Sequence, residues 1–212
     1  MASLLCPALV LFAARLSGFA VGLLVLFWVL HPLLMVIGFI LLSGEAILVH
    51  RWLPGSMGLK KSVHLGLQGV ALASGIFGIW TKFQGKDGIV ANFYSLHSWM
   101  GLICISLFGI QWLLGFLNFW HRREAKLARI KILPWHVFLG LYTYALAVAT
   151  AETGLLEKLA FIQTKRNNVS KHSTESMLVN SLGLFLAMLS GFVILAAVSP
   201  KYGYHTLQSR QH

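Results

Sequence analysis

The chain has 212 residues, of which 57% are hydrophobic and only 11% are charged. Soluble domains carry about 25% charged residues, so this composition excludes an ordinary soluble protein and favours one embedded in lipid. The formal net charge is +11, but the basic residues stand in short segments between apolar runs, where such residues set membrane orientation. We therefore expect a lipid bilayer as the environment and no nucleic acid as a partner.

The first apolar run extends from Leu4 to about Val49, which is too long for a single membrane span of about 20 residues. Proline disfavours helical geometry in the residue before it and is tolerated in a first helical turn. The pair His31-Pro32 is therefore the expected break between two helices. It predicts spans at about 4–29 and 31–49, with almost no connection between them.

Further apolar runs follow at about 63–80, 94–120, 133–151 and 177–198. The sequence thus predicts an all-α membrane protein with six transmembrane helices in one domain that covers residues 1–212. Lys and Arg are more numerous in the segments after the second and fourth spans and in the C-terminal tail than on the opposite side. The positive-inside tendency then places both termini in the cytosol. Cys6 and Cys104 lie inside apolar runs and predict no disulfide framework.

Four histidines stand at or just inside the start of a predicted span, one on each of four consecutive helices: His31, His64, His97 and His136. Ionisable residues at membrane depth are costly and by default mark functional sites inside the bundle. Consecutive spans run in opposite directions, so His31 can meet only His97. By the same parity, His64 can meet only His136. Each pair would offer one imidazole to each face of a planar macrocycle, and bis-histidine ligation suits an electron-transferring haem iron.

Five segments carry a family resemblance: His31–Phe39, Gly44–Val49, Asn92–Trp99, Leu133–His136 and Ala149–Lys158. These segments resemble the transmembrane ascorbate-dependent cytochrome b561 proteins in their plant form, and the match covers nearly the whole chain. The stretches Ser95–Trp99 and Leu133–His136 are the most specific, and each contains one of the histidines already chosen. The chain departs from the family in having no loop between Leu30 and His31, and in having no histidine in the stretch Gln84-Gly85-Lys86.

The resemblance implies a central bundle of helices two to five that holds two haems b. The non-cytosolic iron would lie between His31 and His97, and the cytosolic iron between His64 and His136. The implied activity is that of an ascorbate-dependent transmembrane oxidoreductase, which takes electrons from cytosolic ascorbate and delivers them to monodehydroascorbate or ferric chelates on the other face. No side chain is expected to act as a covalent catalyst.

The resemblance also implies two substrate sites. Their residues are Lys60, Lys61 and Arg129 for cytosolic ascorbate, and Asn92 and Tyr94 for the non-cytosolic acceptor. The vacuolar membrane, another endomembrane and the plasma membrane all remain open as locations, and so does a homodimer.

Three other functions stay open or are disfavoured by the pattern. A haem-b membrane subunit of another redox chain fits the same histidines. A histidine-relay transporter for protons or metal ions would have its histidines near the midplane or along one path, whereas these lie at the two edges. A structural zinc site would need four ligands at one point.

Overall fold

The structure, a computed structural model, describes residues 29–83, 93–121, 126–165, 170 and 172–199. All regular secondary structure in this part of the chain is helical. Within it, five helical stretches are long and apolar enough to cross a membrane: Val29–Trp52, Met57–Lys82, Leu96–Trp120, Arg129–Thr164 and Thr174–Val198. The all-α membrane class is therefore confirmed. The span expected at about 4–29 lies, except for Val29, outside the described residues.

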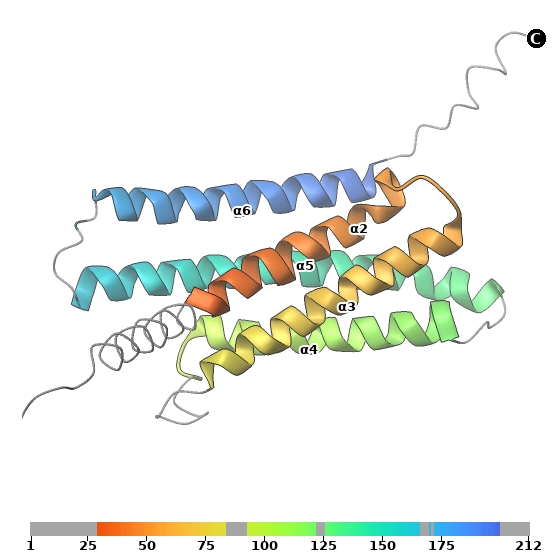
Figure 1. The fold of residues 1–212 in the computed structure, drawn as a ribbon, viewed down its shortest axis with the longest axis horizontal. Helices are drawn as coiled ribbons and strands as arrows, with labels where there is room; N and C mark the ends of the chain where they lie inside the picture. The colour runs from red at the N-terminus through yellow and green to blue at the C-terminus, as the bar shows by residue number, and fades with distance from the viewer. Residues whose placement is uncertain (1–28, 84–92, 122–125, 166–169, 171, 200–212) are drawn as a thin grey trace, which may run out of the picture.

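The elements follow one another as long helices that run back and forth (Figure 1). In chain order they are the π-helix η1 (Leu34–Leu41), α2 (Leu42–Trp52), α3 (Met57–Lys82), α4 (Leu96–Phe116), the π-helix η3 (Leu117–His121), α5 (Lys126–Lys165) and α6 (Thr174–Val198). The residues that join η1 to α2 and α4 to η3 are themselves helical, so each pair forms one continuous rod.

Serine residues set the starts of three helices. Ser56, Ser95 and Ser173 each precede a helix in extended conformation, and each side-chain oxygen accepts a hydrogen bond from the backbone N–H three residues further on. Such a cap satisfies one of the unpaired donors of a first helical turn. Because Ser56 caps α3, that helix begins at Met57 and not at about 63 as hydropathy predicted. The preceding Gly55 has a φ of 112°, which glycine adopts readily in the turn between α2 and α3.

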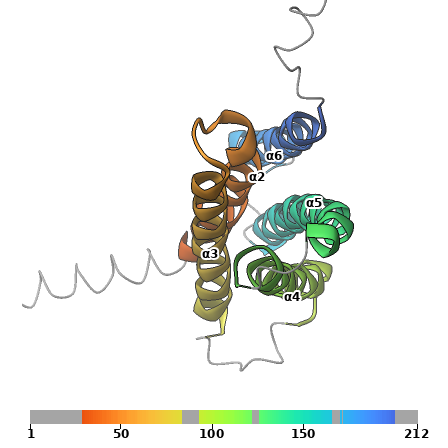
Figure 2. The same cartoon turned by 90° about the vertical axis from the view of Figure 1, so that its right-hand side faces the viewer.

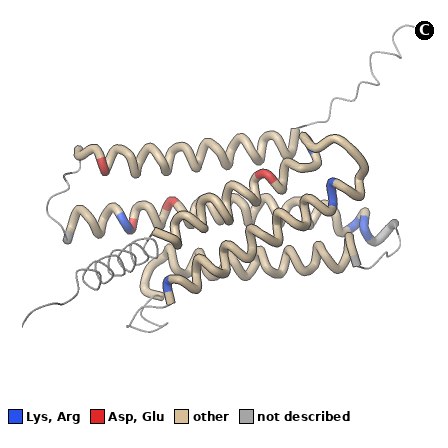
Figure 3. Tube along the Cα trace, viewed as in Figure 1, with Lys and Arg blue, Asp and Glu red and all other residues tan. Residues whose placement is uncertain are grey.

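Four rods enclose the centre of the bundle. The rod of η1 and α2 packs on α3, α3 packs on α4, α4 packs on α5, and α5 returns to η1. The end-on view shows this arrangement, with α6 outside it against α2 and α5 (Figure 2). The described Lys and Arg residues lie toward the ends of the helices, as expected for helices whose middle parts are in lipid (Figure 3).

Helix α5 is much longer than the predicted span of 133–151. It runs from Lys126 to Lys165 and contains Pro134 within it, so parts of the segments expected as loops are helical. The predicted span ended before Glu152, because this is the first charged residue after the apolar run. A helix continues as long as its residues favour one, and the stretch 155–163 is rich in Leu, Ala, Glu and Lys, which are good helix formers. The first described rod, Val29–Trp52, likewise begins two residues ahead of the start that was expected at 31.

The buried core lies in the middle of the bundle. Its members include Phe39, Ile40, Cys104, Tyr144 and Leu186. On each of the four inner rods, a core residue lies seven or eight positions after the histidine of that rod: Phe39, Ala71, Cys104 and Tyr144. The core therefore separates the two ends of the bundle, where the candidate site residues are found.

Candidate functional site

The four predicted histidines come together in two pairs. The ring centroids of His31 and His97 lie 6.1 Å apart with their planes at 90°, and those of His64 and His136 lie 6.4 Å apart with their planes at 67°. An imidazole nitrogen lies about 2 Å from a bound metal, and the ring adds about 1 Å to its centroid, so two opposed axial imidazoles have centroids about 6 Å apart. The planes of two axial imidazoles can have any rotation relative to each other about the line that joins their two metal-binding nitrogens. The spacing in each pair suits two axial ligands of one metal.

Three of these rings are held by main-chain carbonyl groups. His31 Nδ1 lies 2.8 Å from the oxygen of Gly78, His64 Nδ1 lies 2.7 Å from that of Ala46, and His97 Nδ1 lies 2.8 Å from that of Thr150. A carbonyl oxygen only accepts, so Nδ1 carries the proton and donates. This leaves the lone pair on Nε2, as in most metal-ligating histidines.

The fourth ring has a side-chain partner instead. His136 Nδ1 lies 3.0 Å from Nε2 of Gln111. The same amide nitrogen donates a hydrogen bond of 2.6 Å to the main-chain oxygen of His136. Sequence reasoning did not select Gln111, because a single glutamine in an apolar helix is ambiguous without its neighbours.

Each inner rod serves both histidine pairs. It carries one histidine and, on its other half, the group that holds a histidine of the other pair: His31 and Ala46, His64 and Gly78, His97 and Gln111, and His136 and Thr150. The separation is fifteen residues on the first rod and fourteen on the other three, or about 21 Å of helix at a rise of 1.5 Å per residue. Because three of the four partners are main-chain carbonyl groups, which no residue type marks, this spacing becomes visible only in the structure.

Two glycines make room for the histidine rings. A Cβ atom at Gly154 would lie 2.7 Å from Cε1 of His97, and one at Gly115 would lie 2.9 Å from Cε1 of His136. Each ring therefore packs directly against the backbone of a neighbouring helix. Among the described residues, no group of three or more His, Cys, Asp or Glu side chains could hold a metal ion. A site with two imidazoles fits a metal that brings its own equatorial ligands, and haem is such a group.

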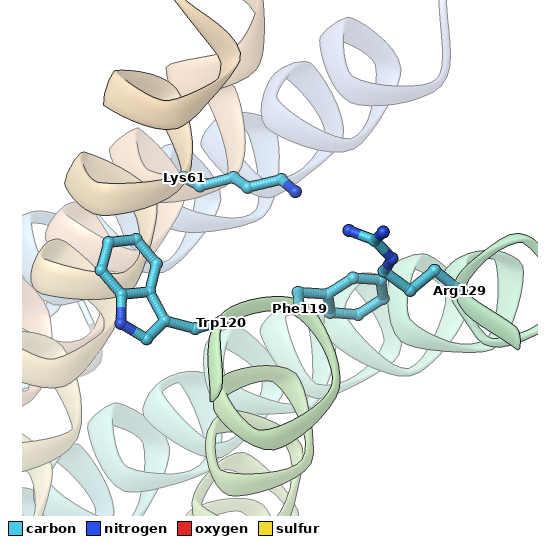
Figure 4. A pocket seen from close by; sticks show the side chains of 4 residues that line it. All are labelled: Lys61, Phe119, Trp120 and Arg129. Atoms are coloured by element: carbon cyan, nitrogen blue, oxygen red, sulfur yellow. The ribbon is translucent and has the colours of Figure 1, made fainter. Parts of the chain in front are cut away.

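A cationic cavity opens near the His64 and His136 pair. It has a volume of about 420 Å³ and is lined by Lys61, Phe119, Trp120 and Arg129 (Figure 4). The Lys61 ammonium and the Arg129 guanidinium point toward each other across it (Figure 4). The third expected cation, Lys60, is half-buried but does not line the cavity. The ring of Phe119, which the sequence analysis did not select, lies 5.2 Å from that of His136 and so connects the cavity to the histidine pair.

His50 is a further residue of this end that the sequence analysis did not select. Its ring centroid lies 5.5 Å from that of His64. The residue is half-buried near the end of α2. It therefore contributes a polar ring to the surroundings of His64.

The opposite end of the bundle holds a phenol and a carboxylate in contact. The hydroxyl of Tyr94 donates a hydrogen bond of 2.8 Å to Oε1 of Glu157, and Oε2 of Glu157 is buried without a hydrogen-bond partner in the described part of the chain. The pKa of Tyr94 is raised above that of a free tyrosine, mainly by the hydrogen bond to this carboxylate. Lys82 interacts electrostatically with both Glu157 and Lys158. Asn92, expected beside Tyr94, lies outside the described residues.

Comparisons with known sequences agree on one family. The family described as eukaryotic cytochrome b561 matches residues 30–162, which include all four paired histidines. The chain is 64% identical over 211 residues to a protein of Arabidopsis thaliana called probable transmembrane ascorbate ferrireductase 4, covering 94% of this chain and 89% of the relative. It is 43% identical to transmembrane ascorbate ferrireductase 2 of the same plant, covering 89% and 90%. It is 44% identical to ascorbate-specific transmembrane electron transporter 2 of Zea mays, covering 80% and 72%.

Proposed function

Because this chain belongs to the eukaryotic cytochrome b561 family, we propose that it is an ascorbate-dependent oxidoreductase that carries electrons across a membrane. The names of its relatives support ascorbate as the electron donor. The observation that carries the proposal is the presence of two histidine pairs at opposite ends of a membrane-spanning bundle.

Each histidine pair would hold one haem b. His64 and His136 are the ligands for the cytosolic haem, and His31 and His97 are those for the non-cytosolic haem. Bound there, haem iron supplies reversible one-electron chemistry. The carbonyl groups of Gly78, Ala46 and Thr150 bind Nδ1 of three of the rings, which would leave Nε2 of each ring to bind iron.

The cationic cavity is the proposed ascorbate site. Ascorbate is a monoanion at neutral pH, and charge-assisted hydrogen bonds from an ammonium and a guanidinium group favour such an anion. Lys61 and Arg129 would bind its ring oxygens, while Phe119 and Trp120 would shield it from water. Lys60 would add positive potential from outside the cavity.

The proposed acceptor site is at the other end, around Tyr94 and Asn92. Monodehydroascorbate and ferric chelates are anions, and Lys82 and Lys158 supply positive charge at this end. The Tyr94 hydroxyl would exchange its hydrogen bond to Glu157 for one to an oxygen atom of the acceptor. The membrane is the vacuolar membrane, another endomembrane or the plasma membrane, with both termini in the cytosol and a sixth span formed by residues of about 4–29. A homodimer is compatible with this arrangement.

The test is to count haems and to identify their ligands. The purified chain in lipid nanodiscs should contain two b-type haems, and ascorbate should reduce at least part of them in the visible difference spectrum. His64→Ala and His31→Ala should each lower the content toward one haem per chain. His172→Ala, an exposed histidine outside the bundle, is the control and should retain both. A chain that folds as a helical protein but binds no haem would rule out the proposal.

A further inference from the structure

Glu45 is a carboxylate on the outside of the first described rod, Val29–Trp52. Its side chain is exposed, and among the described residues none forms a hydrogen bond or an ion pair with it. It stands directly before Ala46, whose carbonyl holds His64, so it lies within the span at the depth of that histidine pair. A carboxylate at membrane depth is costly unless an opposite charge is close to it. The described part of the bundle supplies no such charge.

An exposed apolar stripe leads along the rod to this carboxylate. Its members follow one another at intervals of four residues, and all are exposed: Val29, Leu33, Ile37, Leu41 and Glu45. We call this set the outer stripe. The helices α3 and α6 pack on other faces of the same rod. Lipid alone would suit the apolar members of the stripe, but the carboxylate calls for a partner that brings a positive charge into the membrane.

The sequence ahead of the rod contains such a charge. Residues 4–28 of the predicted first span are apolar except for one charged residue, Arg15. Gly18 and Gly22 follow it at three and seven positions, so all three lie on the same face of a helix. Two glycines at this spacing favour the close approach of another helix in a membrane. The sequence thus predicts a packing face that carries a single cation.

The two faces match in register. Helices that pack antiparallel are commonly joined by a loop of only about 2–5 residues. A tight turn directly ahead of Val29 places Gly22 opposite Leu33 and Gly18 opposite Ile37, because each pair is equally far from the turn. The small residues of one helix then meet the large residues of the other.

The same register brings the two charges together. Arg15 lies opposite position 40, about five residues or 7.5 Å along the axis from Glu45. Side chains of a helix tilt toward its N-terminus, and antiparallel helices have their N-termini at opposite ends. The side chains of Arg15 and Glu45 therefore tilt toward each other, which brings the long arginine side chain within reach of the carboxylate.

We propose that residues 4–28 pack antiparallel on the outer stripe and that Arg15 forms an intramembrane ion pair with Glu45. The inference rests on the six-span arrangement of the proposed function. A guanidinium group can bind a carboxylate through two parallel hydrogen bonds, which suits a pair shielded from water. The other candidate occupant of the stripe is a second copy of the chain, and the experiment distinguishes the two.

The first experiment is a double-mutant cycle on the full chain in nanodiscs with haem bound. Arg15→Leu and Glu45→Leu should each lower the midpoint of thermal unfolding by about 5–10 °C, because each leaves one charge alone in the membrane. The double variant should recover most of this loss, and so should the exchange of Arg15→Glu with Glu45→Arg. Glu152→Leu is the matched control, because it removes another carboxylate from a membrane span, and its effect should add to that of Arg15→Leu.

The second experiment identifies the occupant by cross-linking. Cys6→Ser leaves only Cys104, which is buried. In that background, Gly18→Cys with Ile37→Cys should react with a short thiol cross-linker to give a product with the mass of one chain. The control pairs Gly18→Cys with Ile103→Cys on α4, because Ile103 is exposed and lies six residues after His97, as Ile37 lies six residues after His31. It should give no product.

Additive losses in the double variant would overturn the ion pair. A product that joins two chains would overturn the proposed packing and assign the stripe to a second copy, and equal reaction at Ile103 would show that the first span is not held at the stripe. An unsubstituted chain that binds no haem, yet whose cysteine variant gives the product between positions 18 and 37, would overturn the proposed function and leave this inference standing.

Discussion

Replacing Gly154 by alanine is expected to weaken haem binding at the non-cytosolic site and to leave the cytosolic site intact. The added Cβ atom would lie 2.7 Å from Cε1 and 2.8 Å from Nδ1 of His97, and ordinary Cβ contacts begin at 3.4 Å. The ring must therefore move by several tenths of an ångström. Ligand distances in metal sites are defined to about 0.2 Å, so the displacement is larger than the site tolerates.

The cost can be estimated from overpacked cores, in which inserted methyl groups destabilise by about 1–3 kcal/mol. At 1.4 kcal/mol for each factor of ten, haem affinity should fall by roughly 5-fold to 150-fold. The assay is a titration of the haem-free chain with haem, followed by the visible spectrum of each site. Gly115→Ala, with a Cβ atom 2.9 Å from Cε1 of His136, should show the reciprocal effect at the cytosolic site.

Gly109→Ala is the matched control, because a Cβ atom at Gly109 on the same helix as Gly115 has no neighbour within 4 Å. It should bind both haems as the unsubstituted chain does. The reasoning would be refuted if Gly154→Ala bound the non-cytosolic haem with unchanged affinity, or if Gly109→Ala weakened it equally.

Three further predictions concern the two substrate sites. Lys61→Gln and Arg129→Gln should each raise the KM for ascorbate at least about tenfold, since hydrogen bonds to charged groups contribute about 1.5–3 kcal/mol. Lys60→Gln should have a smaller effect, because Lys60 does not line the cavity. Lys131→Gln, which changes an exposed residue, is the control. A rise in KM for Lys131→Gln as large as for Lys61→Gln would show that only overall charge matters. Tyr94→Phe should slow reduction of the non-cytosolic acceptor while leaving haem reduction by ascorbate unchanged. Because the hydrogen bond to Glu157 raises the pKa of Tyr94, the phenol keeps its proton to a higher pH than a free tyrosine does. The alkaline loss of acceptor reduction that depends on Tyr94, measured as the difference between the unsubstituted chain and Tyr94→Phe, should therefore begin at a higher pH than the titration of a free tyrosine.

The pairing of the histidines could be predicted because it depends only on parity. Successive spans alternate in direction, so His31 and His97 must start on the same side of the membrane, and His64 and His136 on the other. This holds wherever the helices begin and end. The ends of the helices were less predictable. Hydropathy marks the residues that are suited to lipid, whereas capping residues and local helix propensity determine where a helix begins and ends. Ser56 and the extension of α5 beyond Glu152 are examples.

The partners of the histidines could not be read from composition alone. Three of them are main-chain carbonyl groups, which any residue supplies, so no residue type marks them. Phe119 was missed because an aromatic residue near a membrane interface is common, and only packing places its ring against His136. The cations Lys61 and Arg129 were recognisable by charge, but the exclusion of Lys60 from the cavity depends on which face of α3 it occupies.

Each inner rod carries residues that serve both histidine pairs, so insertions and deletions between those residues are restricted. A single residue inserted between positions 64 and 78 would rotate one end of α3 by about 100° relative to the other and shift it by 1.5 Å. Either His64 or the carbonyl of Gly78 would then face away from its partner. A single insertion would therefore disrupt the histidine pair at one face of the membrane or at the other. Length changes should therefore accumulate in the connections between spans and be nearly absent between each histidine and the residue fourteen or fifteen positions away.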